Sequence, residues 1–207
     1  MSLTRWMLVL CVTLVCLPVP GLAAEAASQT PSLQGGIPMS ERSGLITFKG
    51  GPLTLLGDDL PVGQKVPDFT LLANDLSPVK LADTKGVRVF TTVPSLDTPV
   101  CDLQVKRFNE EAGKLLNVSI FAVSADLPFA QARWCGGAGV KNLKTLSDHR
   151  DMAFAKAWGV WIKELRLLAR AVFVVDSQGV LLYKELVKEV TTPPNYDAAL
   201  EALKKAR

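Results

Sequence analysis

Runs of β-branched and aromatic residues alternate with helical periodicities along most of this chain. Two such runs, at residues 87–93 and 118–124, are rich in Val, Ile and Phe and predict buried strands. Between them, apolar residues recur at spacings of three and four, which predicts an amphipathic helix. These residues are Val105, Phe108, Ala112, Leu115 and Leu116. A strand, a helix and a strand in close succession favour a parallel strand pair with a right-handed crossover.

The C-terminal third of the chain predicts an antiparallel hairpin followed by a helix. Apolar runs at residues 171–175 and 180–186 flank Asp176-Ser-Gln-Gly179, a segment typical of a tight turn. Residues 195–206 predict the closing helix. Strand–helix–strand followed by strand–strand–helix is the order of a thioredoxin-like fold. We therefore expect an α/β protein with a central mixed β-sheet flanked by helices.

Shorter patterns predict the remaining elements. Residues 45–48 and 53–56 flank Gly50-Gly51-Pro52 and predict an N-terminal β-hairpin. Residues 66–71 predict a short edge strand. Two short helices are expected at residues 128–134 and 152–158.

The first residues have the pattern of a secretory signal peptide. Residues 6–24 carry no charge and follow Arg5, and Pro18 and Pro20 interrupt the apolar stretch before small residues take over. A basic start, a short apolar segment and an Ala-rich exit are typical of a cleaved leader. The alternative is an uncleaved membrane anchor, but the prolines leave fewer than the ~20 apolar residues that a span needs. We expect residues 1–26 to be the signal peptide and the mature protein to be periplasmic or secreted.

Removal of the leader leaves a simple domain organisation and two cysteines. Residues 27–44 are rich in Ser, Gly, Pro and Gln and predict a flexible linker, whereas residues 45–207 predict one domain. Cys101 and Cys135 are the only cysteines beyond the leader. Because export permits disulfides, a static structural disulfide between them is the plainest interpretation before other motifs are considered.

Composition excludes several classes of function. Of the 207 residues, 48% are hydrophobic and 21% are charged, which is the balance of a globular protein. The net charge is only +3 and the Lys and Arg residues are scattered, so we expect no nucleic-acid partner. The single histidine, His149, lies among charged residues and predicts a solvated loop. Phosphate-binding and dinucleotide-binding motifs are absent from the sequence, as is a Cys-x-x-Cys pair, so we expect neither an organic cofactor nor a metal.

The segment after the strand at 87–93 is the first candidate for chemistry. Pro99 suits the first position of a helix, and Thr98 or Asp97 suits its N-cap. Cys101 then falls in the first turn, where free backbone N–H groups and the helix dipole stabilise a thiolate. The Thr98 hydroxyl is expected within hydrogen-bonding reach of the sulfur. The alternative is a buried, inert cysteine in a helix cap.

Two further residues could act together with Cys101. Arg170 precedes the strand at 171–175, where it either marks a strand end or directs its guanidinium at the sulfur to hold a thiolate. Cys135 precedes Gly136-Gly137, and these glycines suggest a segment that can move.

At this point the sequence resembles a known family, the peroxiredoxins. Residues 94–101, Pro-Ser-Leu-Asp-Thr-Pro-Val-Cys, match the active-site pattern Pro-x-x-x-Thr-x-x-Cys, and more narrowly the atypical two-cysteine branch called thiol peroxidases. Residues 133–136, Arg-Trp-Cys-Gly, are similar to the segment with the family's resolving cysteine. Residues 169–176 resemble the strand of the family arginine. The similarity extends from about Ile46 to Lys204.

The resemblance implies a role for each matched residue. Cys101 would be the peroxidatic nucleophile, activated by Thr98 and Arg170, with Pro94 shielding the pocket. Cys135 would be the resolving cysteine that forms an intramolecular disulfide with Cys101. The implied activity is thiol-dependent reduction of hydrogen peroxide and alkyl hydroperoxides in antioxidant defence. The implied partners are a thioredoxin-like dithiol reductant and a second copy of the chain in a homodimer.

The sequence departs from the family in two respects, and two rival functions stay open. Residues 160–168 are shorter than the loop expected before the arginine, which affects the pocket and the dimer contacts. An export signal is also unusual, because thioredoxin is cytosolic. One rival is an exported thiol–disulfide oxidoreductase, which the missing Cys-x-x-Cys disfavours. The other is a non-enzymatic domain with a structural disulfide.

Overall fold

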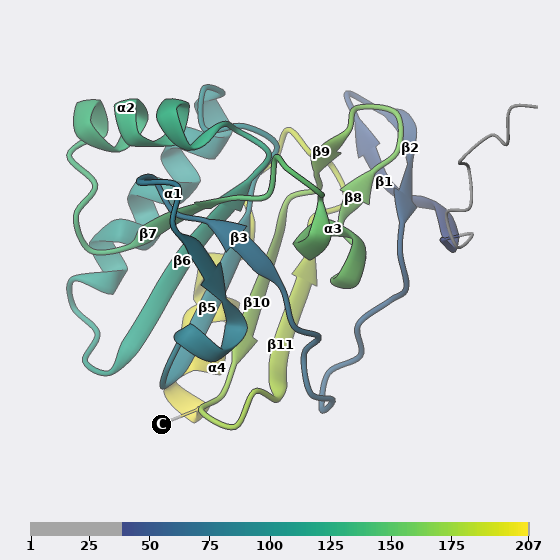
Figure 1. The fold of residues 1–207 in the computed structure, drawn as a ribbon. Coiled ribbons are helices and arrows are strands. Elements are labelled where there is room, and N and C mark those ends of the chain that lie inside the picture. The colour runs from purple at the N-terminus through teal and green to yellow at the C-terminus, as the bar shows by residue number, and fades with distance from the viewer. Residues whose placement is uncertain (1–38, 207) are drawn as a thin grey trace, which may run out of the picture. The chain divides into compact units, whose positions relative to one another are not determined.

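The computed structural model describes residues 39–206 and contains a seven-stranded mixed sheet with helices on both faces (Figure 1). Its strand order is β11-β10-β5-β6-β7-β3-β4. The strands are β3 (Thr70–Leu72), β4 (Pro78–Lys80), β5 (Val87–Thr92), β6 (Val118–Ser124), β7 (Lys144–Ser147), β10 (Ala171–Val175) and β11 (Leu181–Leu186). The expected thioredoxin-like α/β fold is confirmed.

The predicted strand–helix–strand unit forms the centre of this sheet. β5 and β6 pair in parallel, with Val87 opposite Val118 and Thr92 opposite Val123. Helix α1 (Pro99–Ala112) connects them. All six residues of β5 are buried because the sheet is covered on both faces, and they include the polar residues Arg88, Thr91 and Thr92.

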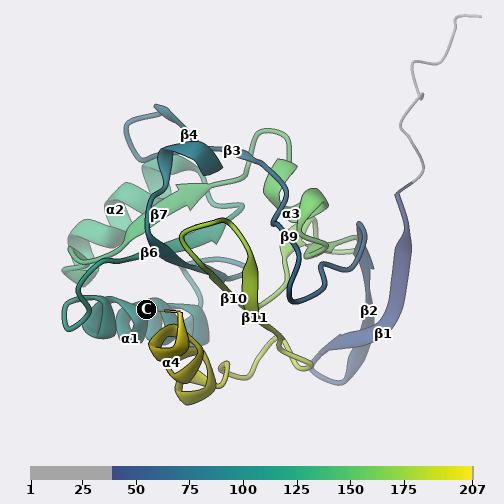
Figure 2. The ribbon, with the colours of Figure 1, turned by 90° about the horizontal axis from the view of Figure 1, so that it is seen from below.

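Each face of the sheet has its own core. On one face, α1 and α4 (Tyr196–Lys205) cover a cluster that includes Cys101, Val105 and Phe108 (Figure 2). On the other face, α3 (Ala153–Ala157) packs over a cluster of aromatic rings with centroids 4.3–6.4 Å apart. Helix α2 (Pro128–Ala138) packs along β7.

The predicted N-terminal hairpin is confirmed and is part of a second, four-stranded sheet. Its strands are β1 (Glu41–Phe48), β2 (Gly51–Leu56), β8 (Trp161–Ile162) and β9 (Leu167–Leu168). The first strand among the described residues begins at Glu41, four residues before the predicted domain start at 45. The end of the predicted linker 27–44 is therefore a strand. The predicted leader and residues 27–38 of the predicted linker lie outside the described residues.

Two local predictions differ from the structure, and one further short element was not predicted. The edge strand expected at 66–71 is β3, which lies inside the sheet, because β4 pairs with it and forms the edge. A one-turn 3-10 helix, η1 (Leu81–Asp83), follows β4. Helix α2 continues past the predicted end at residue 134 to Ala138 and stops at Gly139, whose φ of +66° suits glycine. None of the helices in residues 39–206 is both long and apolar enough to cross a membrane.

Candidate active site

The topology of the sheet brings Cys101 and Arg170 to the same end of neighbouring strands. β5 ends at Thr92, and the chain then turns into α1, whose third residue is Cys101. β10 runs antiparallel to β5 with Ala171 opposite Thr92. Arg170, which directly precedes β10, therefore lies beside the start of α1.

The guanidinium of Arg170 contacts the sulfur of Cys101. Nη2 of Arg170 donates a hydrogen bond to Cys101 Sγ over 3.3 Å. Both residues are buried, Cys101 with none of its surface exposed and Arg170 with 2% exposed. Because the surroundings exclude water, the positive charge of Arg170 acts on the sulfur with little screening. The contact expected from the sequence is present.

Arg170 is held in place by other buried groups. Its Nε and Nη2 donate to the carbonyl oxygen of Val190 over 2.9 and 2.8 Å. Its Nη1 donates to Oε1 of Gln104 over 2.5 Å, and Gln104 Nε2 in turn donates to Thr91 Oγ1 over 2.6 Å. The guanidinium is therefore oriented before any substrate arrives.

Gln104 was not among the predicted site residues. It is completely buried and lies on α1 one turn after Cys101. Residues three apart share a helix face, so a polar side chain at this spacing from Cys101 was the signal that sequence reasoning could have used.

The prediction that Thr98 bonds to the sulfur is wrong for this structure. Thr98 is the N-cap of α1, but its side chain is exposed and makes no cap hydrogen bond. Its hydroxyl instead donates to the carbonyl oxygen of Ser95 over 3.1 Å, and its N–H bonds to the same oxygen over 3.2 Å. This local turn competes with the sulfur for the hydroxyl.

Because the Thr98 side chain does not cap the helix, the first turn of α1 keeps free backbone N–H donors. Pro99 occupies the first helical position, and the first intrahelical bond recorded is from Asp102 N–H to the Thr98 carbonyl. The N–H groups of Val100 and Cys101 precede it and have no intrahelical acceptor. Their partial positive charges add to the field of Arg170.

The loop before α1 is fixed by Asp126, which sequence reasoning also missed. The Asp126 carboxylate accepts a hydrogen bond from Ser95 Oγ over 2.7 Å and from Leu96 N–H over 2.8 Å. Ser124 Oγ donates to the same carboxylate over 2.8 Å. Pro94, at the start of this loop, is buried. The only sequence signal for Asp126 was its position just after a predicted strand.

Cys135 lies near the end of α2 and is half-buried. Its sulfur is 3.4 Å from Oγ1 of Thr145 on β7. It lines a groove of about 840 Å3 between the end of α2 and the β3–β4 hairpin. Cys101 and Cys135 are both free thiols, so the pair does not form a static disulfide in this structure.

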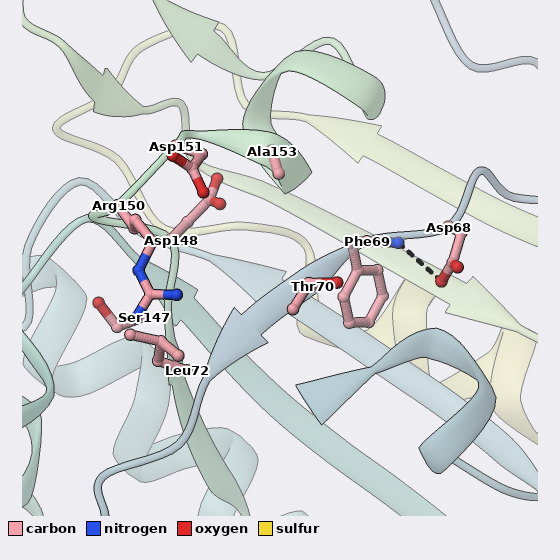
Figure 3. Close-up of a pocket in the computed structure, with 9 residues that line it drawn as sticks. All are labelled: Asp68, Phe69, Thr70, Leu72, Ser147, Asp148, Arg150, Asp151 and Ala153. Carbon is pink, nitrogen blue, oxygen red and sulfur yellow. Dashed lines mark hydrogen bonds between the residues drawn. The ribbon is translucent and has the colours of Figure 1, made fainter. Parts of the chain in front are cut away.

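A separate cavity lies between β3 and the start of α3 (Figure 3). Its volume is about 380 Å3, and its lining includes Asp148 and Asp151 with Asp68 across the opening. Burial raises the pKa of Asp148 to about 6. None of the predicted catalytic residues lines this cavity. His149 is next to it, with Nδ1 2.9 Å from Ser147 Oγ.

Comparison with curated proteins gives one consistent family. A family model described as Redoxin matches residues 61–200. The chain is 58% identical over 160 residues to the thiol peroxidase of Bacillus subtilis (strain 168), covering 77% of this chain and 96% of the relative. It is 59% identical over 162 residues to the thiol peroxidase of Halalkalibacterium halodurans, covering 78% of this chain and 98% of the relative.

Solved structures agree with these relatives. A peroxiredoxin-like protein from Aquifex aeolicus aligns with a TM-score of 0.75 and 39% identity, over 82% of this chain and 99% of that one. The thiol peroxidase from Chromobacterium violaceum aligns with a TM-score of 0.71 over 77% of this chain and 95% of that one. At 21% identity, this second match supports the fold alone.

These matches cover the part of the chain that contains the buried Cys101–Arg170 contact. They support an enzyme of the peroxiredoxin type with thiol-dependent peroxidase activity, and they do not favour the two rival functions. The chain belongs to the thiol peroxidase family and carries a Redoxin domain.

Proposed function

We propose that Cys101 is the nucleophile of this peroxidase and that Cys135 resolves the oxidised form. The observation that carries the proposal is the 3.3 Å contact between the buried Arg170 guanidinium and the Cys101 sulfur. A cation clamped on a buried thiol has a clear chemical use, which is to keep the sulfur as the anion that attacks peroxides.

The first step oxidises Cys101 and reduces the peroxide. A lone pair of the thiolate forms a bond to the distal peroxide oxygen, and the O–O bond breaks. The leaving alkoxide, or hydroxide from hydrogen peroxide, takes a proton and departs as alcohol or water. Cys101 is left as a sulfenic acid. Arg170 and the free N–H groups of the first turn of α1 stabilise the charge that moves onto the leaving oxygen.

The second step joins the two sulfurs. The Cys135 thiol condenses with the Cys101 sulfenic acid, which releases water and forms an intramolecular disulfide. Cys101 is buried in its helix turn and Cys135 faces β7, so the first turn of α1 and the end of α2 must both move. A dithiol reductant then restores both thiols by exchange.

Thr98 and Pro94 belong to the loop that a peroxide must pass to reach the sulfur. Cys101 has no exposed surface, so a peroxide reaches the sulfur only when the loop at 94–98 shifts. This shift frees the Thr98 hydroxyl from Ser95 and lets it turn towards the peroxide. Pro94 shields the sulfur from water at the start of the same loop.

The groove beside α1 suits alkyl hydroperoxides as well as hydrogen peroxide. It has a volume of about 840 Å3 and lies between α1 and the segment that begins α4. Val100, the neighbour of Cys101, forms part of its wall, together with Leu103 and Pro193. Apolar walls beside the first turn of α1 favour a substrate whose alkyl part can be buried.

We also propose that the enzyme works outside the cytoplasm as a homodimer and is reduced by a thioredoxin-like protein of that compartment. The sequence pattern of residues 1–26 supports export. The family resemblance supports the reductant and the dimer, and sedimentation velocity of the reduced protein tests the dimer.

Single-turnover oxidation tests the assignment of the two cysteines. Reduced protein is mixed with one equivalent of cumene hydroperoxide, and intact mass is followed with time. We expect the wild type to lose two hydrogens, Cys135→Ser to gain one oxygen and stop, and Cys101→Ser to stay unchanged. Peroxide consumption by Cys101→Ser at the wild-type rate would refute the proposal.

A further inference from the structure

One hydrogen bond joins the immediate neighbours of the two cysteines. Trp134 precedes Cys135 on α2, and Asp102 follows Cys101 on α1. Nε1 of Trp134 donates to Oδ1 of Asp102 over 3.1 Å. Resting on the proposed function, we propose that Trp134 and Asp102 form a latch that holds Cys101 against Arg170, and that release of this latch controls the rate of disulfide formation.

Asp102 stabilises the first turn of α1 in three ways. It is an acidic residue at the positive end of the helix. Its Oδ2 accepts a hydrogen bond from Lys106, one turn later, over 2.9 Å. Its Oδ1 accepts the bond from Trp134. Because the same turn carries Cys101, each of these interactions favours the state in which the sulfur contacts Arg170.

Trp134 attaches the second half of α2 to α1. The residues of α2 that are fully buried, Pro128 and Gln131, lie in its first half. Beyond them, Trp134 is half-buried and packs against the core cluster that contains Cys101. The neighbouring ion pair of Arg133 with Asp97 spans 3.6 Å between largely exposed side chains and contributes little.

The two movements required for the disulfide both break this bond. Unwinding the first turn of α1 to release Cys101 displaces Asp102. Moving the end of α2 so that Cys135 leaves Thr145 displaces Trp134. The latch therefore opposes disulfide formation but does not oppose attack on peroxide, which requires a shift of the loop at 94–98 while the first turn of α1 stays wound. The two residues are positioning residues, since neither touches the reacting sulfur.

The variant Trp134→Phe tests the latch, because it keeps an aromatic ring and removes the N–H. Rapid-quench intact mass separates the peroxide step, which adds one oxygen, from the later step that forms the disulfide. A hydrogen bond to a charged group of this exposure predicts disulfide formation about five-fold faster, with the peroxide step changed by less than about two-fold.

Trp161→Phe is the matched control. The indole nitrogen of Trp161 is buried and has no hydrogen-bond partner among residues 39–206, so the same substitution there breaks no such bond. We expect this variant to oxidise and form its disulfide at wild-type rates. Equal disulfide rates in the two Phe variants, or a slower rate in Trp134→Phe, would overturn the latch and leave the peroxidase assignment intact.

A double-mutant cycle and a product ratio provide independent readouts. If the two side chains act through one bond, adding Asp102→Ala to Trp134→Phe gives no acceleration beyond the faster single variant, within about two-fold. A second peroxide converts the sulfenic acid to a sulfinic acid in competition with the disulfide. Under excess peroxide, Trp134→Phe should therefore form about five-fold less sulfinic acid than Trp161→Phe. The latch would be excluded if the double variant formed its disulfide at a rate that multiplies the two single effects. It would also be excluded if Trp134→Phe and Trp161→Phe formed equal amounts of sulfinic acid.

Discussion

Arg170 is a buried cation with every guanidinium nitrogen committed to an acceptor. The carbonyl of Val190 takes two of its hydrogen bonds, Gln104 takes a third and the Cys101 sulfur takes the fourth. The bonds to Val190 and Gln104 are made to neutral oxygens, so none of the groups that hold the guanidinium neutralises its charge. The positive charge is therefore available to the sulfur and to the leaving oxygen of a peroxide.

The Gln104 amide should matter to the peroxide step although it does not touch the sulfur. Gln104→Leu leaves Nη1 of Arg170 and the Thr91 hydroxyl without this partner in the core. We expect a loss of about 1–3 kcal/mol in unfolding free energy and a slower peroxide step, by about ten-fold, because the guanidinium is no longer fixed. Urea unfolding and stopped-flow thiol oxidation measure the two effects.

Gln131→Leu is the control for Gln104→Leu. Gln131 is equally buried, and its Nε2 bonds to Ser124 Oγ and the Leu146 carbonyl, away from Arg170. It should lose comparable stability and keep the wild-type peroxide step. If both variants slow that step equally, Gln104 acts through stability alone and its positioning role is wrong.

Thr98 gives a prediction that separates stability from catalysis. Its exposed hydroxyl bonds only to the Ser95 carbonyl in the resting structure, so Thr98→Val should change unfolding free energy by no more than about 0.5 kcal/mol. If the hydroxyl turns to the peroxide during reaction, the same variant should lower the second-order rate constant about 10- to 100-fold. Thr98→Ser, which keeps the hydroxyl, should retain most of the rate. A Val variant as fast as wild type would remove Thr98 from the mechanism.

The sequence predicted the strands and helices whose residue pattern is local. β5, α1 and β6 each repeat one pattern over six or more residues, and the β10–β11 hairpin has a clear turn. β8 and β9 have two residues each. β8 forms because it pairs with β2, and β9 forms because it pairs with β8, so no pattern within them could reveal them.

The difference between local and long-range signals also explains which site residues the sequence predicted. Cys101 was identified from its place at a helix start, Arg170 from its place before a predicted strand and Cys135 from its place before two glycines, and the family resemblance then implied their roles. Gln104 and Asp126 were missed because their partners lie 66 and 31 residues away in the chain. Thr98 was misjudged because a bond to a carbonyl three residues back competes with the sulfur.

The stability that Asp148 contributes at the start of helix α3 depends on pH. The buried Asp148 carboxylate accepts hydrogen bonds from Phe154 N–H and Ala155 N–H, but desolvation still raises its pKa to about 6. A carboxyl whose pKa is higher in the folded state binds more protons there than in the unfolded state. Its contribution to stability is therefore full below about pH 4 and is lost as pH rises through about 6.

The difference between wild type and Asp148→Asn isolates this contribution from that of other carboxylates. The amide stays neutral at every pH, whereas the Asp148 carboxyl loses its proton as pH rises. The unfolding free energy of the variant should therefore rise relative to that of the wild type by up to about 3 kcal/mol between pH 4 and pH 7. Urea unfolding of both reduced proteins at several pH values measures this difference. A difference that stays constant with pH would show that Asp148 ionises normally in the fold.

The site depends on parts of the fold that are distant in sequence. The Val190 carbonyl that clamps Arg170 belongs to a turn fixed by Glu189. The Glu189 carboxylate accepts hydrogen bonds from the hydroxyls of Thr191 and Thr47, which hold its pKa well below the usual range. Through Thr47, the β1–β2 hairpin is tied to the turn that positions the Arg170 guanidinium.

This connection indicates which N-terminal residues can be removed without disturbing the site. The proposed leader ends at residue 26, whereas the first strand begins at Glu41 and the hairpin contact to Glu189 is at Thr47. Removal of residues 1–26 therefore leaves every described contact of the site intact. We expect a bacterium that exports the full chain to yield a periplasmic or secreted protein whose intact mass lacks about 26 residues, with the peroxidase activity of the full chain.

The leader itself can be tested apart from the enzyme. Residues 1–26 fused to a phosphatase that is active only outside the cytoplasm should give active reporter, because an apolar segment after Arg5 is what the export machinery recognises. Leu8→Arg places a charge within that segment and should abolish reporter activity, whereas Ser2→Arg adds the same charge before it and should not. A silent wild-type fusion, together with a full chain that keeps its first 26 residues inside the cell, would disprove export. The reductant would then be a cytosolic thioredoxin, because the Cys101–Cys135 chemistry requires only a dithiol that shares its compartment.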